Sequence, residues 1–103
     1  MSQFENVSVM KKANVYSDGK CVSHTLRFAD GTRKSVGVMF PSSLQFTTGA
    51  AEILDVLDGE CCVRLAGQSE FVAYHGGQSF NVPANTAFEI EVLTTLHYVC
   101  HFV

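Results

Sequence analysis

Short, closely spaced turns are the feature that most constrains the fold of this chain. Residues that favour turns recur at intervals of about 8–12 residues along much of the sequence. These turn signals are Asp18-Gly19, Asp30-Gly31, Pro41-Ser42-Ser43, Thr48-Gly49, Asp58-Gly59, Ala66-Gly67, Gly76-Gly77 and Pro83-Ala84-Asn85. The segments between them are too short for most helices but long enough for strands. The spacing therefore favours β-structure.

The segments between the turns also have the composition of strands. They are rich in Val, Phe, Ile and Thr, and comprise residues 35–40, 53–58, 60–66, 70–74, 79–82, 87–93 and 97–103. In one of them Phe88, Ile90 and Val92 alternate with Glu89 and Glu91, as expected for a strand with one face toward solvent. These patterns predict an all-β fold.

The length of the chain, 103 residues, predicts a single domain over residues 1–103. Residues 1–13 are interpreted as an N-terminal strand or extension, and one helical turn is predicted near residues 49–52. About ten short strands in one small domain must close into a barrel or stack as two sheets, because an open sheet would bury too little apolar surface. We therefore expect a barrel whose own inward-facing residues form any functional site.

Charge and cysteine content exclude several functional classes. Seven Lys and Arg against ten Asp and Glu give a net charge of −3, which does not favour nucleic-acid binding. No apolar run approaches the roughly 18 residues of a membrane-spanning helix, and the N-terminus lacks the pattern of a secretion signal. The four cysteines are therefore expected to remain thiols in a cytoplasmic protein.

Two spacings narrow the type of barrel. Glu52 precedes Gly59 by seven positions, and Gly77 precedes Pro83 by six. These are the spacings of the second half of the first cupin motif and the first half of the second, so the chain resembles a cupin, a double-stranded β-helix or jelly-roll barrel. The resemblance implies that the histidine ligands of a metal cupin would lie at three positions, which here hold Phe46, Thr48 and Phe88.

The remaining histidines do not replace that ligand set. His97 and His101 share one strand face but lack an obvious third ligand, which disfavours a transition-metal site. They are interpreted as an exposed or dimer-facing surface. Cys100 lies on the opposite face from both, so no cysteine–histidine nucleophile is expected, and we interpret Cys100 as a small buried apolar residue.

Longer strings give a closer match. The segments RKSVGVMFP (33–41), QFTTGAAEILDVLDGE (45–60), YHGGQSFNVPANTAFEIEV (74–92) and YVCHF (98–102) are similar to the small cupin-type pyrimidine/purine nucleoside phosphorylases. This resemblance covers about residues 14–103. It implies a broad-specificity, metal-free homodimer without a cofactor. The implied reaction is phosphate-dependent cleavage of purine and pyrimidine nucleosides to free base and ribose 1-phosphate, with inorganic phosphate as co-substrate.

The chemistry of phosphorolysis suggests roles for the polar residues. Arg33 is predicted to bind phosphate as a catalytic residue, with Lys34 beside it as a substrate-binding residue. Glu52 is the second catalytic candidate, because an inward carboxylate could hold ribose hydroxyls and stabilise positive charge at C1′. Thr48 shares the inward face with Phe46 and is predicted to contact phosphate or ribose.

Aromatic side chains are the candidates for the nucleobase. Strand alternation could send Phe46, Phe80, Phe88 and Tyr98 inward, and stacking on such rings depends little on base identity. Phe46, Phe88 and Tyr98 are predicted to contact substrate. Gly37 within a strand suggests either a ligand or a close approach of backbone.

Two other functional classes stay open at this level. A non-enzymatic cupin could use the same cavity to bind a small ligand without turnover. A metal-dependent cupin enzyme could use an unconventional ligand set that includes His97, His101 or Cys100. The sequence does not say which nucleosides would be preferred.

Overall fold

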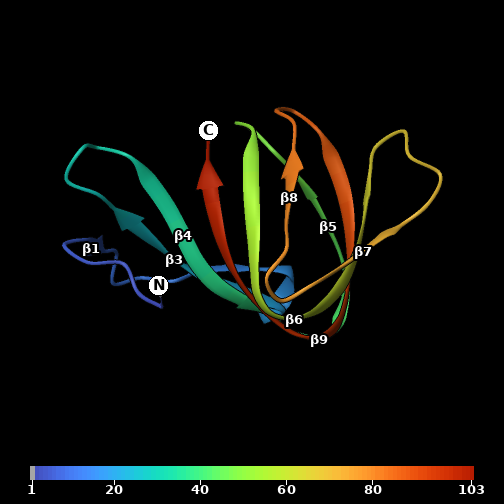
Figure 1. Cartoon of the computed structure of the whole chain (residues 1–103), viewed down its shortest axis with the longest axis horizontal. Coiled ribbons are helices and arrows are strands. Elements are labelled where there is room, and N and C mark those ends of the chain that lie inside the picture. The colour runs from blue at the N-terminus through green and yellow to red at the C-terminus, as the bar shows by residue number, and fades with distance from the viewer. Residues whose placement is uncertain (1) are drawn as a thin grey trace.

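The computed structural model describes residues 2–103, and nearly all of its regular structure is β-strand (Figure 1). In this part of the chain there are nine strands and one short 3-10 turn, η1 (Ser17–Gly19). The strands are β1 (Ser8–Val9), β2 (Asn14–Tyr16), β3 (Cys21–Arg27), β4 (Arg33–Met39), β5 (Ser42–Thr47), β6 (Glu52–Leu65), β7 (Val72–His75), β8 (Ser79–Val82) and β9 (Ala87–Phe102). The predicted all-β fold is confirmed.

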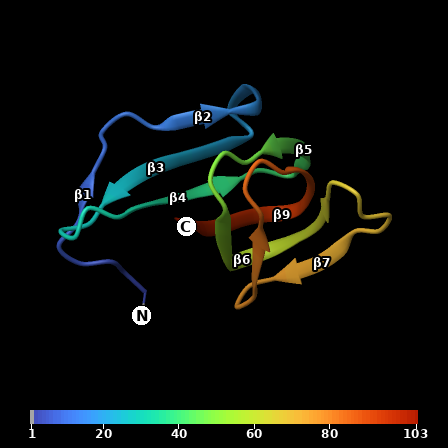
Figure 2. The ribbon, with the colours of Figure 1, turned by 90° about the horizontal axis from the view of Figure 1, so that it is seen from above.

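Two long strands organise the barrel. β6 has 14 residues and β9 has 16, and they pair antiparallel along most of their length. β9 also pairs with β4 near its C-terminal end and with β5 near its N-terminal end, while β6 pairs with β7 and β8. Figure 1 shows both long strands bending along the floor of the barrel, and Figure 2 shows β3, β4, β9 and β6 side by side.

A β-bulge lets β6 bend. The register between β6 and β9 shifts three times between Val56 and Cys61. Gly59 lies in this region with φ +97°, and a Cβ there would be 2.3 Å from the carbonyl oxygen of Thr95. Only glycine meets both conditions without strain, because the left-handed region and the close backbone both exclude a side chain.

Several of the element boundaries predicted from the sequence are wrong. Asp58-Gly59 was expected to reverse the chain, but it lies inside β6, so segments 53–58 and 60–66 are one strand. Segment 87–93 and residues 97–102 of the last segment likewise belong to β9. Ser42 begins β5 instead of completing a turn, and residues 49 and 50 form a bend before β6 instead of a helical turn.

The interior of the barrel divides into an apolar core and a polar cavity. Ile90 and Leu96 of β9 are fully buried, and Val56 and Cys61 of β6 are nearly so. They belong to one apolar cluster that fills the floor of the barrel. Toward the open end of β4, β6 and β9, the inward side chains become polar, and this change creates the candidate site.

The bulge yields a stability prediction. Gly59→Ala should lower the free energy of unfolding by about 1–3 kcal/mol, because alanine at positive φ is strained and its Cβ would press on Thr95. Gly49→Ala is the matched control, since a Cβ there meets open space. Urea unfolding of both variants measures the difference, and equal stabilities would contradict the role given to Gly59.

Candidate functional site

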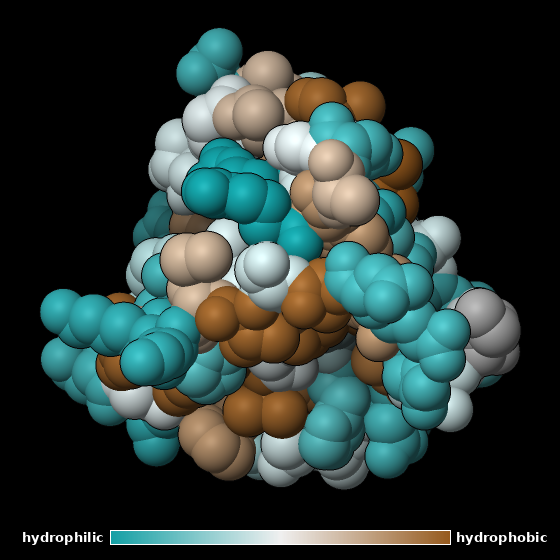
Figure 3. All heavy atoms as spheres, turned by 90° about the vertical axis from the view of Figure 1, so that its left-hand side faces the viewer, coloured by the Kyte–Doolittle hydropathy of each residue, from teal (hydrophilic) through white to brown (hydrophobic). Residues whose placement is uncertain are grey.

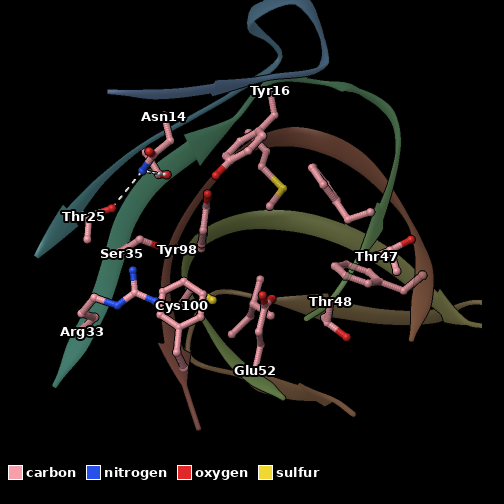
Figure 4. Close-up of a pocket in the computed structure, with 16 residues that line it drawn as sticks. Asn14, Tyr16, Thr25, Arg33, Ser35, Thr47, Thr48, Glu52, Tyr98 and Cys100 are labelled. Atoms are coloured by element: carbon pink, nitrogen blue, oxygen red, sulfur yellow. Dashed lines mark hydrogen bonds between the residues drawn. The ribbon is translucent and has the colours of Figure 1, made fainter. Parts of the chain in front are cut away.

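A cavity of about 370 Å³ opens between the β2–β3–β4 side of the barrel and the strands β5, β6 and β9 (Figure 4). Its volume falls within the range typical of small-molecule sites, roughly 300–1,000 Å³. Strand alternation explains which side chains reach it. On β4, for example, Arg33, Ser35 and Met39 line the cavity, whereas Lys34, Val36 and Val38 point to the outer face.

The strand register arranges the side chains in rows. At the mouth, Phe102 of β9 pairs with Glu52 of β6, and Arg33 of β4 lies on the other side of Phe102. The Arg33 guanidinium carbon is 5.5 Å from the centre of the Phe102 ring. Arg33 is the one cationic side chain, and Glu52 the one carboxylate, among the described residues that line the cavity. The mouth therefore carries one charge of each sign.

The next row is neutral and polar. Thr25 pairs with Ser35, Ser35 with Cys100, and Cys100 with Leu54. Ser35 and Cys100 are buried, and Thr25 is half-buried. Moving inward from the mouth, a ligand would thus meet charged groups first and hydroxyl and thiol groups second.

Glu52 is held in its acid form more strongly than an exposed glutamate. Burial raises the pKa of its carboxyl, and a hydrogen bond from the Cys100 thiol partly opposes that shift. No ion pair to Glu52 exists among residues 2–103. An inward carboxylate without a cationic partner is costly, so a ligand that offers hydroxyl donors or positive charge would stabilise its ionised form.

Cys100 and Tyr98 are neutral components of the wall. Burial and the neighbouring Glu52 raise the pKa of the Cys100 thiol to about 12, so it stays protonated at neutral pH and is a poor nucleophile. Burial also raises the pKa of Tyr98, whose hydroxyl lies 3.4 Å from the sulfur of Cys21. The structure thus agrees that Cys100 is buried, but its thiol contacts Glu52 and lines the cavity instead of serving only as apolar filling.

Aromatic rings form the opposite wall. The ring of Phe46 lies 5.7 Å from Phe88 and 6.3 Å from Tyr16, in a tilted and an edge-to-face arrangement respectively. All three residues line the cavity. Phe80 does not: it packs against Tyr74 in the core at 4.9 Å between ring centres. Three of the predicted aromatics, Phe46, Phe88 and Tyr98, therefore face the cavity.

Thr48 lies at the rim with its hydroxyl already engaged. The hydroxyl donates to the carbonyl oxygen of Pro83 at 2.6 Å and accepts from the backbone N–H of Thr86 at 3.0 Å. It ties β5 to the loop before β9. Its hydrogen is therefore not available to a ligand, although the residue does line the cavity.

Lys34 lies on the other side of the sheet from Arg33. Its ammonium group is 2.6 Å from Nδ1 of His101, whose Nε2 is 2.6 Å from a carboxylate oxygen of Asp55. These three residues link β4, β9 and β6 on the outer face. Adjacent residues of a strand point to opposite faces, so the predicted Arg33/Lys34 cluster is divided and Lys34 does not line the cavity.

His97 and His101, which were interpreted as an exposed or dimer-facing surface, both lie on the outer face. His97 is exposed on β9, while His101 is half-buried between Lys34 and Asp55. Across residues 2–103, no group of three or more His, Cys, Asp or Glu side chains is close enough to hold a metal ion. Phe46, Thr48 and Phe88, which the cupin resemblance aligns with histidine ligands, all line the cavity.

Several wall residues were not anticipated from sequence. Asn14 and Tyr16 come from β2, which has only three residues, and Figure 4 shows both above the cavity. Asn14 donates to the hydroxyl oxygens of Ser23 and Thr25 at 3.3 and 3.0 Å. Alternation with Arg33 would have identified Ser35, but the pairing of β2 with β3 has no clear sequence signal.

No helix within the described residues is long and apolar enough to cross a membrane.

Gly37 lies where the backbones of β4 and β3 approach closely: a Cβ at this position would be 2.2 Å from the carbonyl oxygen of Val22 on β3. The glycine therefore serves the packing of β4 against β3.

Solved structures identify the fold. A protein of unknown function from Acinetobacter sp. ADP1 superposes with a TM-score of 0.95 and 46% identity, covering 98% of each chain. An RmlC-like cupin with a double-stranded β-helix fold, from Methanocaldococcus jannaschii, superposes with a TM-score of 0.64 and 20% identity over 92% of each chain. The barrel is a cupin barrel, as predicted.

Sequence comparison identifies the family. The model of the pyrimidine/purine nucleoside phosphorylases matches residues 11–102. A protein of that name from Herminiimonas arsenicoxydans is 62% identical over 102 residues, with 99% of this chain and 98% of the relative covered. Another, from Cupriavidus metallidurans, is 64% identical with 99% of both covered. The chain therefore belongs to the pyrimidine/purine nucleoside phosphorylase family.

Proposed function

We propose that this protein is a broad-specificity nucleoside phosphorylase. It cleaves purine and pyrimidine nucleosides with inorganic phosphate and yields free base and ribose 1-phosphate. The observation that carries the proposal is the composition of the cavity: one cation, one carboxylate and a row of hydroxyls on one wall, with aromatic rings opposite. Full-length similarity to relatives that bear this name supports the same activity.

The two charges at the mouth suit the two polar groups that react, phosphate and ribose. Arg33 offers a planar set of N–H donors to phosphate oxygens. Glu52, beyond Phe102 in the same row, suits a ribose diol, whose hydroxyls donate to a carboxylate. Phosphate and sugar would then lie side by side, which is what attack at C1′ requires.

The reaction needs little covalent chemistry from the protein. A phosphate oxygen forms a bond to C1′ while the C1′–N bond breaks, and the bonding electron pair leaves with the base, which takes up a proton. Positive charge develops on the sugar between these events. In this proposal the Glu52 carboxylate stabilises that charge, and stabilisation that grows in the transition state accelerates the step.

The aromatic wall accounts for a broad substrate range. Tyr16, Phe46 and Phe88 present ring faces and edges that contact purines and pyrimidines alike. Stacking of this kind contributes affinity without reading the pattern of hydrogen-bonding groups on a base.

Three further properties belong to the proposal. The reaction uses phosphate as co-substrate and neither a metal nor an organic cofactor, which is supported by the aromatic and threonine side chains at the cupin ligand positions. The protein acts as a homodimer. It works in the cytoplasm, where its four cysteines would remain reduced, as they are in the structure.

The direct test is incubation of the purified protein with uridine or inosine, with and without phosphate. We expect free base and ribose 1-phosphate only when phosphate is present, detected by chromatography. Metal analysis of the same preparation should find no stoichiometric metal. Treatment with a chelator should leave the rate unchanged. Saturable nucleoside binding without turnover would instead indicate a ligand-binding cupin, and a stoichiometric metal required for activity would indicate a metal enzyme.

Glu52→Gln separates the catalytic from the structural effect of the carboxylate. We expect kcat to fall by roughly 100-fold or more. In the wild type, activity should decline as the pH falls through a pKa above the ordinary glutamate value, and this acid limb should be absent in Glu52→Gln.

The same variant should be more stable than the wild type at neutral pH without ligand. A raised folded-state pKa means that the native state binds the proton more tightly than the unfolded state, so ionisation of Glu52 removes stability as the pH rises through that range. Glu70→Gln, in the exposed β6–β7 loop, is the control. An unchanged kcat with a folded protein would remove Glu52 from the mechanism.

A further inference from the structure

The β3–β4 hairpin brings two arginines together on one face of the sheet. Arg27 is the last residue of β3 and pairs directly with Arg33, the first residue of β4. Strand alternation from Ser23 and Thr25, which line the cavity, places Arg27 on the same inner face. Arg27 is exposed and is not among the residues that line the cavity, so it extends the mouth row beyond Arg33 as a second guanidinium at the outer edge.

The hairpin holds this pair in place. Phe28 and Thr32 close the loop with a backbone hydrogen bond of 2.9 Å, and Gly31 donates to Phe28 at 3.0 Å. The Asp30 carboxylate accepts from the backbone N–H and hydroxyl of Thr32 at 2.9 and 2.7 Å. The acidic residue in the loop is thus engaged within the loop, and the two strand ends are fixed relative to each other.

Neither arginine forms an ion pair with another described residue. The ion pairs among residues 2–103 are Arg64–Glu89 and His101–Asp55, and neither involves Arg27 or Arg33. Like charges directly opposite on a sheet are destabilising. An anion that accepts hydrogen bonds from both guanidinium groups would remove this repulsion.

We propose that Arg27 and Arg33 together bind the phosphate co-substrate at the mouth of the cavity. This assignment rests on the proposed function and adds Arg27 to the site. Phosphate is a multiply charged anion with several acceptor oxygens, and guanidinium groups bind such anions through paired N–H donors. On its other side Arg33 is followed by Phe102 and then Glu52, so phosphate and ribose occupy neighbouring parts of one row.

The charge of the whole chain makes a local cationic site necessary for phosphate binding. The chain as a whole has a net charge of −3, so overall charge does not attract phosphate. Figure 3 views the end of the molecule that carries the β3–β4 hairpin and shows strongly hydrophilic side chains gathered beside an apolar patch. Capture of phosphate therefore depends on a few residues at this end.

The test compares the wild type with Arg27→Gln, Arg27→Lys and Arg33→Gln. Lys20→Gln is the matched control, because it removes one positive charge at the opposite end of β3. Inorganic phosphate alone is titrated calorimetrically, and circular dichroism checks that each variant is folded. We expect Arg27→Gln and Arg33→Gln to bind phosphate about 10- to 100-fold more weakly, Arg27→Lys to be intermediate, and Lys20→Gln to match the wild type.

Thermal unfolding provides a second measurement, in which Arg27→Gln should stabilise the protein although it weakens phosphate binding. Without phosphate, Arg27→Gln should melt at a higher temperature than the wild type, because it removes the like-charge pair. With phosphate, the wild type should gain more in Tm than the variant. In steady-state assays the variant should raise KM for phosphate more than KM for nucleoside.

The outcomes distinguish this inference from the proposed function. Equal phosphate affinity in the wild type and Arg27→Gln, or no phosphate binding by either, would overturn the role of Arg27. Phosphorolysis with an unchanged KM for phosphate in Arg27→Gln would overturn it while leaving the enzyme activity intact. Phosphate binding that depends on Arg27, without release of base from any nucleoside, would support the anion site and contradict the proposed function.

Discussion

The pairing of β6 with β9 is the constraint on which the rest of the structure depends. These two strands contribute the floor of the barrel, and β4, β5, β7 and β8 each pair with one of them. The bulge at Gly59 allows β6 to bend without losing its partner. Because the register is fixed along this pair, the positions of Glu52, Cys100 and Phe102 relative to one another are fixed as well.

The site is built at the expense of stability. Glu52 has a raised pKa, and among the described residues it has no cationic partner. Arg33 lies between the Phe102 ring and Arg27, and no carboxylate in the same part of the chain is paired to it. A chain optimised for stability alone would pair such charges or replace them. Here the apolar cluster beneath the cavity supplies the stability that these groups reduce, and ligand groups complete their interactions. Because no group in the described part of the chain neutralises these charges, they are available to interact with the substrate.

The sequence determined the fold class more firmly than the details of the site. Turn spacing and alternation predicted strands and a barrel, because both signals are local. Gly59 was misinterpreted as a turn because a glycine at positive φ serves turns and bulges equally, and only the partner strand distinguishes them. Lys34 was grouped with Arg33 from adjacency, although alternation separates their side chains. Asn14 and Tyr16 were missed because a three-residue strand has too little sequence to carry a pattern.

The hydrogen bonds around Asn14 give one wall of the cavity a direction. The amide of Asn14 donates to Ser23 and Thr25, and Ser23 is also hydrogen-bonded to Tyr98, whose hydroxyl lies 3.4 Å from the sulfur of Cys21. The oxygen of the Thr25 hydroxyl accepts from Asn14, so the hydroxyl hydrogen is left to point toward another acceptor. Thr25 thus presents a free donor in the same row as Ser35 and Cys100. This wall therefore offers a hydrogen-bond donor to acceptor oxygens, which phosphate, ribose and the carbonyl-bearing bases all carry.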